Sequence, residues 1–278
     1  MNKSIHSTVT LNNGVKIPYL GLGTWQARGR NCEKAVAHAL SSGYTMIDTA
    51  QAYANEAQVG KEWKASGRDR ADIFITTKIS NSNQGYQSAR KSFEESLKDL
   101  QTDYVDLVLI HWPEVKHFSK TVETWRALVE LQEEGLCRSI GVSNFTIALT
   151  EKLVSEIDVM PAVNQVEFHT FLYQKALLEY CLEKQIQIEA YSPIARGKFF
   201  DHHTLQRIAD KHQKTAAQVM LAWLLHHDLV VIPKSVNEQR IDENADIFFT
   251  LDDEDMAALN HLEPQTRLVD GYWAPPNW

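Results

Sequence analysis

Cysteine is scarce in this sequence, which has only Cys32, Cys137 and Cys181 among 278 residues. A number this small and odd excludes a disulfide framework and fits a reducing cytoplasm, so we expect three small buried side chains rather than a redox group. No apolar run approaches the length of a membrane span, and residues 1–8 lack the apolar core of a signal peptide. The sequence therefore predicts a cytoplasmic protein without a membrane segment.

Positive charge is in deficit, because 28 Lys and Arg residues face 36 Asp and Glu residues and leave a net charge of −8. This balance argues against broad nucleic-acid binding, although a small anionic ligand could bind where positive groups gather locally. Metal-ligand clusters are missing as well. The histidine pairs at 202–203 and 226–227 are adjacent residues, which do not face one another on a helix, so we expect no metal site.

Linker composition is absent too, since Pro, Gly and Ser gather nowhere into a boundary segment. The chain instead alternates short β-rich runs with longer helical patterns. Eight alternations predict one α/β domain over residues 1–278, a single (β/α)8 TIM barrel. The expected strands are residues 20–24, 45–49, 73–78, 105–111, 139–143, 162–167, 186–191 and 230–233, and the expected helices are residues 33–42, 56–66, 88–100, 122–134, 146–156, 175–184 and 215–227.

The main alternative fold is a doubly wound open sheet. Such a sheet should carry a Gly-x-Gly-x-x-Gly motif after its first strand. Residues 21–26, GLGTWQ, lack the third glycine. This absence favours the barrel.

Both ends of the chain lie outside the alternation. The pattern of residues 9–17 predicts a β-hairpin with its turn at Asn13 and Gly14, which could cap the N-terminal mouth of a barrel. Residues 267–278 form an irregular tail with three large aromatics, Tyr272, Trp273 and Trp278. This tail either packs on the surface or covers a pocket as a flap.

Four chemically active residues lie at the ends of successive predicted strands. Asp48, Lys78 and His111 each close an apolar run, and Tyr53 follows Asp48 in the next loop. Barrel enzymes place catalysis at this end of their strands. Burying such groups is costly unless they satisfy one another, so we expect one shared site. There Lys78 would lower the pKa of the Tyr53 phenol and Asp48 would keep the lysine charged, so that the tyrosine can donate a proton near neutral pH.

Three segments, in order, resemble the signatures of the aldo-keto reductase family, with an overall pattern similar to its prokaryotic 2,5-diketogluconate reductase branch. They are residues 43–60, GYTMIDTAQAYANEAQVG, residues 138–145, RSIGVSNF, and residues 232–244, IPKSVNEQRIDEN. The resemblance covers nearly the full length of the chain. One departure is Thr45, where the family usually has arginine, and it concerns a local structural contact rather than the chemistry.

The resemblance implies NADPH-dependent reduction of small aldehydes or ketones, such as keto sugars or methylglyoxal, and we expect the enzyme to be a monomer. It implies that Tyr53 is the general acid, that Lys78 lowers the pKa of this tyrosine, that Asp48 holds Lys78, and that His111 orients the substrate carbonyl. It further implies a set of cofactor contacts. These are Ser143, Asn144 and Gln165 at the nicotinamide carboxamide, Tyr191 stacked on the ring, Ser192, and the adenosine-phosphate segment with Lys234, Ser235, Arg240, Glu243 and Asn244.

The substrate pocket is expected to have an aromatic wall. Trp25 follows the first predicted strand and Trp112 follows His111, while Trp273 lies in the tail. Two other function classes stay open. A cofactor-binding barrel without significant turnover is opposed by the intact set of four active residues, and a metal-dependent hydrolase is opposed by the missing ligand cluster.

Overall fold

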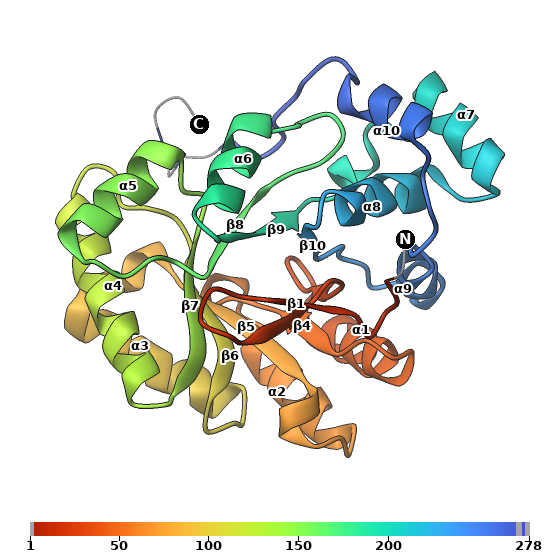
Figure 1. Ribbon diagram of the computed structural model, residues 1–278. Helices are drawn as coiled ribbons and strands as arrows, with labels where there is room; N and C mark the ends of the chain where they lie inside the picture. The colour runs from red at the N-terminus through yellow and green to blue at the C-terminus, as the bar shows by residue number, and fades with distance from the viewer. Residues whose placement is uncertain (1–2, 271–273, 276–278) are drawn as a thin grey trace.

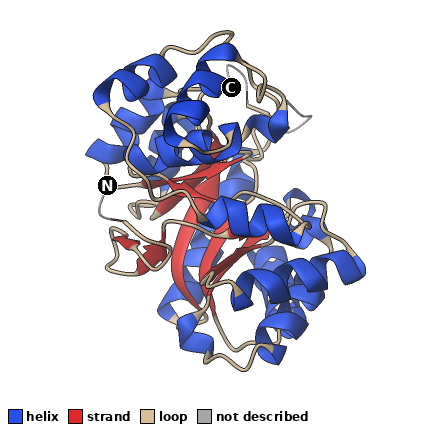
Figure 2. Ribbon diagram, turned by 90° about the vertical axis from the view of Figure 1, so that its right-hand side faces the viewer, coloured by secondary structure: helices blue, strands red, loops and turns tan. Residues whose placement is uncertain are grey.

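Eight parallel strands form a ring at the centre of the protein, and the helices surround it (Figures 1 and 2). The computed structural model describes residues 3–270 and 274–275. Neighbouring strands pair in the order β10-β9-β8-β7-β6-β5-β4-β3, which is chain order read backwards. The strands are β3 (Leu22–Gly23), β4 (Met46–Asp48), β5 (Phe74–Ile79), β6 (Val105–Ile110), β7 (Cys137–Ser143), β8 (Val163–Glu167), β9 (Gln187–Tyr191) and β10 (Val230–Val231).

The ring closes where the first strand meets the last. Isolated parallel bridges join Leu20 to Val231 and Gly23 to Lys234. The backbone here approaches so closely that a Cβ atom at Gly23 would lie 2.7 Å from the carbonyl oxygen of Ile232. Glycine is therefore required at this position. The closure confirms the barrel and excludes the open sheet.

Strands β5 and β6 are rich in apolar residues because both of their faces are covered. Every residue of β5 and of β6 is buried, as expected for parallel strands with helices outside and packed side chains within. Each of the eight predicted strands is present, with no end shifted by more than two residues. No helix in the described part of the chain is both long and apolar enough to cross a membrane.

The outer helices place one apolar stripe against the ring. Helix α1 buries Cys32, Val36 and Ala39, which share one helical face. Helix α8 begins with the capping box that pairs Thr215 with Gln218, as its sequence spacing indicates. The helices are α1 (Gly29–Ser41), α2 (Glu56–Ala65), α3 (Tyr86–Asp99), α4 (Phe118–Glu133), α5 (Ile147–Glu156), α6 (Lys175–Glu183), α7 (His203–His212), α8 (Ala216–His226), α9 (Glu238–Ala245) and α10 (Asp253–Asn260).

The helix predictions were wrong in two respects. Helices α1 and α4 each begin four residues earlier than predicted, because neither start carries a side-chain cap that marks it. Helices α7 and α10 were not predicted. A signal existed for α10, since Asp252 and Asp255 form a capping box at its start.

A two-stranded hairpin closes the N-terminal mouth of the barrel, as predicted. Its strands are β1 (Thr8–Thr10) and β2 (Lys16–Pro18), and Figure 1 shows it across the middle of the ring. Ile17 is fully buried among side chains of the barrel interior. Asn13 Nδ2 donates a hydrogen bond to the carbonyl oxygen of Arg138, at the start of β7. The hairpin does not cover the opposite mouth, where the strands end, and an active site can lie there.

Candidate active site

A buried ion pair lies at the C-terminal mouth of the barrel. Lys78 Nζ, from β5, donates to Asp48 Oδ1 at the end of β4 over 2.6 Å and to the carbonyl oxygen of Thr49 over 2.8 Å. The Lys78 side chain has no exposure and that of Asp48 has 2%. The adjacent parallel strands β4 and β5 bring the two residues to the same edge. Neither charge would be stable there alone.

Tyr53 lies between this ion pair and His111. It belongs to the short helix η1 (Gln51–Tyr53), directly after β4. Its ring centroid is 5.0 Å from Lys78 Nζ and 5.5 Å from the His111 ring, which meets it edge-on. The structure therefore brings the four strand-end residues together. Asp48, Tyr53 and His111 line one cavity, and Lys78 lies behind them.

Burial dominates the protonation of this group. It raises the pKa of the Tyr53 phenol, and the Lys78 charge opposes that rise without reversing it. The expected lowering by Lys78 is present, but the net direction differs from the expectation because desolvation of the phenolate is larger. Burial and the nearby Lys78 charge together lower the pKa of His111 to about 3, so its imidazole is neutral near pH 7.

A hydrogen-bonded network extends from His111 to β9. Asn144 Nδ2 donates to the carbonyl oxygen of His111 over 2.9 Å, and the Tyr191 hydroxyl donates to Asn144 Oδ1 over 2.8 Å. Ser143 Oγ donates to the carbonyl oxygen of Gln165. Asn144 adopts a left-handed backbone with φ of 65°, a conformation that asparagine tolerates. The four predicted nicotinamide contacts are therefore one connected unit.

Gln165 links this network to two carboxyl groups inside the barrel. Its Nε2 donates to Asp48 Oδ2 and to Glu189 Oε2, each over 2.8 Å. Glu189 was not predicted as a site residue, although a lone charge in the buried strand at residues 186–191 was a signal. Burial, followed by the charge of Asp48, raises the pKa of Glu189 to about 8.

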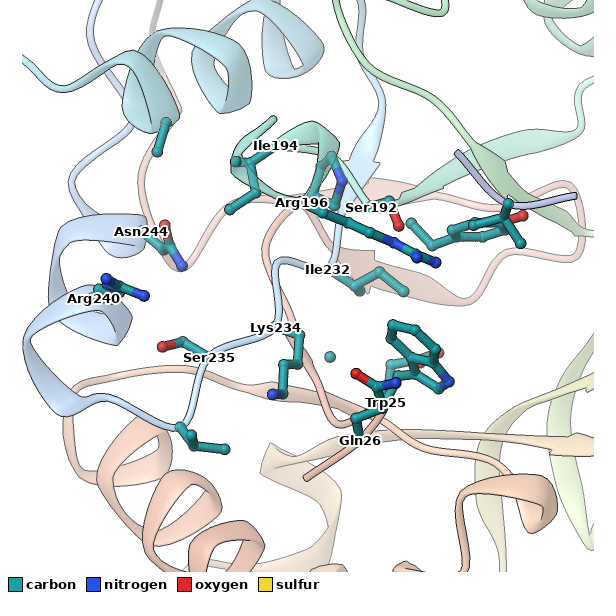
Figure 3. Close-up of a pocket in the computed structure, with 18 of the residues that line it drawn as sticks. Trp25, Gln26, Ser192, Ile194, Arg196, Ile232, Lys234, Ser235, Arg240 and Asn244 are labelled. Atoms are coloured by element: carbon teal, nitrogen blue, oxygen red, sulfur yellow. The ribbon is translucent and has the colours of Figure 1, made fainter. Parts of the chain in front are cut away.

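The segment after β10 borders the other end of the cavity (Figure 3). Ser235 is buried, and Asn237 caps helix α9 by accepting from the backbone of Arg240. Arg240 is exposed on that helix, whereas Lys234 is half-buried. Among the described residues neither cation forms an ion pair with a carboxylate. These two positive groups therefore lie beside the cavity without a carboxylate partner among the described residues.

One continuous cavity of about 1140 Å³ connects these parts. Trp25 lies at its rim, 40% exposed, and the Arg196 guanidinium lies 4.7 Å from its ring centroid. No sequence pattern indicated this contact between Arg196 and Trp25. The predicted site residues that line the cavity are Trp25, Asp48, Tyr53, His111, Trp112, Ser143, Asn144, Gln165, Tyr191, Ser192, Lys234, Ser235, Arg240, Glu243 and Asn244.

The first part of the C-terminal tail is tied to β8. Glu167 accepts hydrogen bonds from the backbone nitrogens of Leu268 and Val269, each over 2.8 Å, and from His169 Nε2. Val269 lines the cavity. Residues up to 269 therefore reach the site. The predicted aromatics Tyr272, Trp273 and Trp278 lie outside the described residues.

Comparisons with known proteins agree with this geometry. The pattern of the aldo/keto reductase family matches residues 19–264. The chain is 46% identical over 270 residues to glyoxal reductase of Bacillus subtilis, covering 96% of this chain and 97% of that protein. An aldo/keto reductase structure from Brucella melitensis is 48% identical, with a TM-score of 0.90 and coverage of 92% and 99% of the two chains. A Gox0644 mutant in complex with NADPH is 40% identical, with a TM-score of 0.88 and coverage of 91% and 92%. This chain belongs to the aldo/keto reductase family.

Proposed function

We propose that this protein reduces small aldehydes and ketones, glyoxal-like dicarbonyls among them, to alcohols with NADPH. The observation that carries the proposal is Tyr53, held between the Asp48–Lys78 ion pair and neutral His111 in the cavity wall. The similarity to a glyoxal reductase and to a protein bound to NADPH supports the substrate class and the cofactor. That the enzyme is a cytoplasmic monomer stays a prediction.

The residues present fit a nicotinamide dinucleotide. A cavity of about 1140 Å³ exceeds the usual range for one small ligand, so it can take a dinucleotide and a small substrate together. Lys234 and Arg240 supply positive charge at one end for the phosphates. At the other end Ser143, Asn144 and Gln165 would hold the carboxamide, and Tyr191 would lie against the ring. Ser192, Ser235, Glu243 and Asn244 line the cavity between and around these groups.

Residues of the chain then donate the proton and stabilise the negative charge. The bound dinucleotide supplies a hydride to the carbonyl carbon. As negative charge develops on the substrate oxygen, the Tyr53 phenol donates its proton to that oxygen. The Lys78 ammonium stabilises the phenolate that is left, and Asp48 keeps the ammonium in place. A neutral His111 can donate one hydrogen bond to the substrate oxygen without competing for the proton.

Substrate size is set by the aromatic rim. Trp25 and Trp112 line the cavity beside the catalytic group, and Arg196 packs over Trp25. These walls suit a small carbonyl compound. That Trp273 contributes to the substrate pocket stays a prediction.

The experiment measures NADPH oxidation with glyoxal, methylglyoxal and an aromatic aldehyde, for the wild type and for Tyr53→Phe. General acid catalysis is worth about 10²–10⁴ in rate, so kcat should fall by that factor. NADPH affinity, followed by tryptophan fluorescence, should stay near that of the wild type. Binding without oxidation of NADPH in the wild type would instead indicate a cofactor-binding protein, and loss of activity with a chelator would indicate a metal-dependent enzyme.

A further inference from the structure

We propose that Glu189 is a positioning residue for the cofactor, because its buried carboxyl group fixes which side of the Gln165 amide faces the cavity. The inference rests on the proposed function, in which the Gln165 side chain meets the nicotinamide carboxamide. It extends that function by one residue, which sits behind the cavity wall. Glu189 itself does not line the cavity.

The hydrogen bonds of the Gln165 amide determine its orientation. A glutamine amide has two N–H donors and one carbonyl acceptor. Both donors of Gln165 are in use, one on Asp48 and one on Glu189, each over 2.8 Å. The side chain also lines the cavity. Its Oε1 is therefore the group left for a ligand, and the site offers an acceptor to the amide protons of a carboxamide.

Glu189 is needed as a second acceptor for Gln165 because Asp48 also binds Lys78. Asp48 Oδ1 is engaged by Lys78, and only Oδ2 reaches Gln165. With one acceptor the amide could turn its second N–H away. With acceptors on both sides, a flip would place the carbonyl oxygen of Gln165 against the Asp48 carboxylate, which repels it, and would give up both N–H hydrogen bonds. Asp48 thus opposes the flipped orientation, and Glu189 accepts the second N–H of the correct one.

The hydrogen bonding of Glu189 argues against a purely structural role for this residue. The other carboxyl groups buried on the described barrel strands, those of Asp48, Asp106 and Glu167, have both oxygens hydrogen-bonded. Glu189 Oε1 is buried without a partner. A buried polar atom left unpaired costs free energy, so packing alone does not explain a glutamate here. In the part of the chain that the structure describes, its one hydrogen bond is the one from Gln165.

The charges around Glu189 are compatible with its role as a hydrogen-bond acceptor for Gln165. The ionisable groups that face it are Asp48, Lys78 and Tyr53, while its partner on β10 is the apolar Val230. Burial and then Asp48 raise the pKa of Glu189, so it is mostly protonated near pH 7. A protonated carboxyl group still accepts through its carbonyl oxygen. The interior then holds one positive and one negative charge in Lys78 and Asp48.

The test compares binding of NADP⁺ with binding of adenosine 2′,5′-bisphosphate, a fragment that lacks the nicotinamide. Glu189→Leu removes the acceptor and should weaken NADP⁺ binding about three- to tenfold, the value of one net hydrogen bond. Binding of the fragment should not change. Glu189→Gln keeps an acceptor and should restore most of the NADP⁺ affinity. Glu56→Leu is the matched control, because Glu56 is a buried glutamate that bonds Thr77 and Ser96 instead.

A double-mutant cycle with Gln165→Leu decides whether Glu189 acts through Gln165. In the Gln165→Leu background, Glu189→Leu should cost almost nothing further. Additive losses, or equal losses for NADP⁺ and the fragment, would overturn the inference. A wild type that binds the fragment and NADP⁺ equally would instead argue against the proposed function. Should Glu189→Leu not fold, Glu189→Met removes the same acceptor with a more adaptable side chain.

Discussion

Lys78 and Asp48 are stable in the interior only as a pair, which makes their contributions to catalysis dependent on each other. Without Lys78 the pKa of the Tyr53 phenol rises further, since the one opposing charge is gone. Without the Asp48 charge, Lys78 loses its 2.6 Å partner and its effect on the phenol weakens. The two residues therefore act on the same quantity.

We accordingly expect the losses to be non-additive. Lys78→Met and Asp48→Asn should each lower kcat/KM, and the double variant should lose less than the sum of the two in log units, because residues in contact couple. The measurement is steady-state kinetics with methylglyoxal, with melting temperatures to confirm folding. Strictly additive losses would mean that the pair does not tune Tyr53 jointly.

Arg240 should discriminate between the two dinucleotides. NADPH carries a 2′-phosphate that NADH lacks, and a guanidinium can meet phosphate oxygens with two hydrogen bonds. Hydrogen bonds to charged groups contribute about 1.5–3 kcal/mol, so Arg240→Met should weaken NADPH binding about 10- to 150-fold and leave NADH nearly unchanged. Lys234→Met should act likewise, with less selectivity if the ammonium also meets the pyrophosphate.

Fluorescence titration of both cofactors tests this, with Arg207→Met as a control. Arg207 is an exposed arginine on α7 that does not line the cavity. Equal losses of NADPH and NADH in Arg240→Met would show that the cofactor preference comes from another residue.

At the scale of the elements, the strands were predictable, whereas the starts of helices α1 and α4 were not. Buried parallel strands such as β5 and β6 are short runs rich in β-branched and apolar residues, and the ends of such runs can be recognised in the sequence. A helix without a side-chain cap, such as α1 or α4, has no such mark in the sequence.

The same reasoning separates the site residues that sequence revealed from those it missed. Asp48, Lys78 and His111 interrupt apolar runs at their ends and so are conspicuous. Glu189 lies inside a run, and Arg196 meets Trp25 only because two loops converge in space. Contacts of that kind depend on tertiary packing, which sequence spacing does not encode.

Strand β8 should control the position of the tail through Glu167. Burial works to raise the pKa of Glu167, but hydrogen bonds from His169, Leu268 and Val269 outweigh it and hold the pKa below its usual 4.5. The stabilising contribution is therefore complete above about pH 4.5 and is lost as the pH falls through the lowered value. The tail should stay anchored throughout the neutral range.

Trypsin cleavage after Arg267 measures this anchor. Glu167→Gln removes the charge and one acceptor, so cleavage at pH 8 should accelerate about tenfold, corresponding to the loss of one hydrogen bond to a charged group. Glu189→Gln is the control, because Glu189 forms no hydrogen bond with the described residues of the tail. Unchanged cleavage in Glu167→Gln would show that other contacts hold residues 268–269.

At the scale of the whole molecule, stability and chemistry occupy opposite mouths of the barrel. Ile17 is fully buried where the hairpin closes one mouth, and Tyr53 lies at the other. Ile17→Ala should lower the free energy of unfolding by about 2–5 kcal/mol, since it leaves a cavity. The value of kcat should stay close to that of the wild type.

Urea denaturation and steady-state kinetics on the same preparation test this separation. Thr10→Ala, an exposed position in the same hairpin, should change stability by no more than about 0.5 kcal/mol. A large fall of kcat in a folded Ile17→Ala protein would show that the two mouths are coupled.

The seam between the first and last strands has a consequence for synthesis on the ribosome. Residue 20 cannot find its neighbour until residue 231 has left the exit tunnel, so the nascent chain must carry an unpaired strand edge for most of its elongation. Contacts so distant along the chain also slow folding. We therefore expect a ribosome-bound chain that ends before β10 to bind chaperones and to be degraded by proteases, and release of the complete chain to protect it.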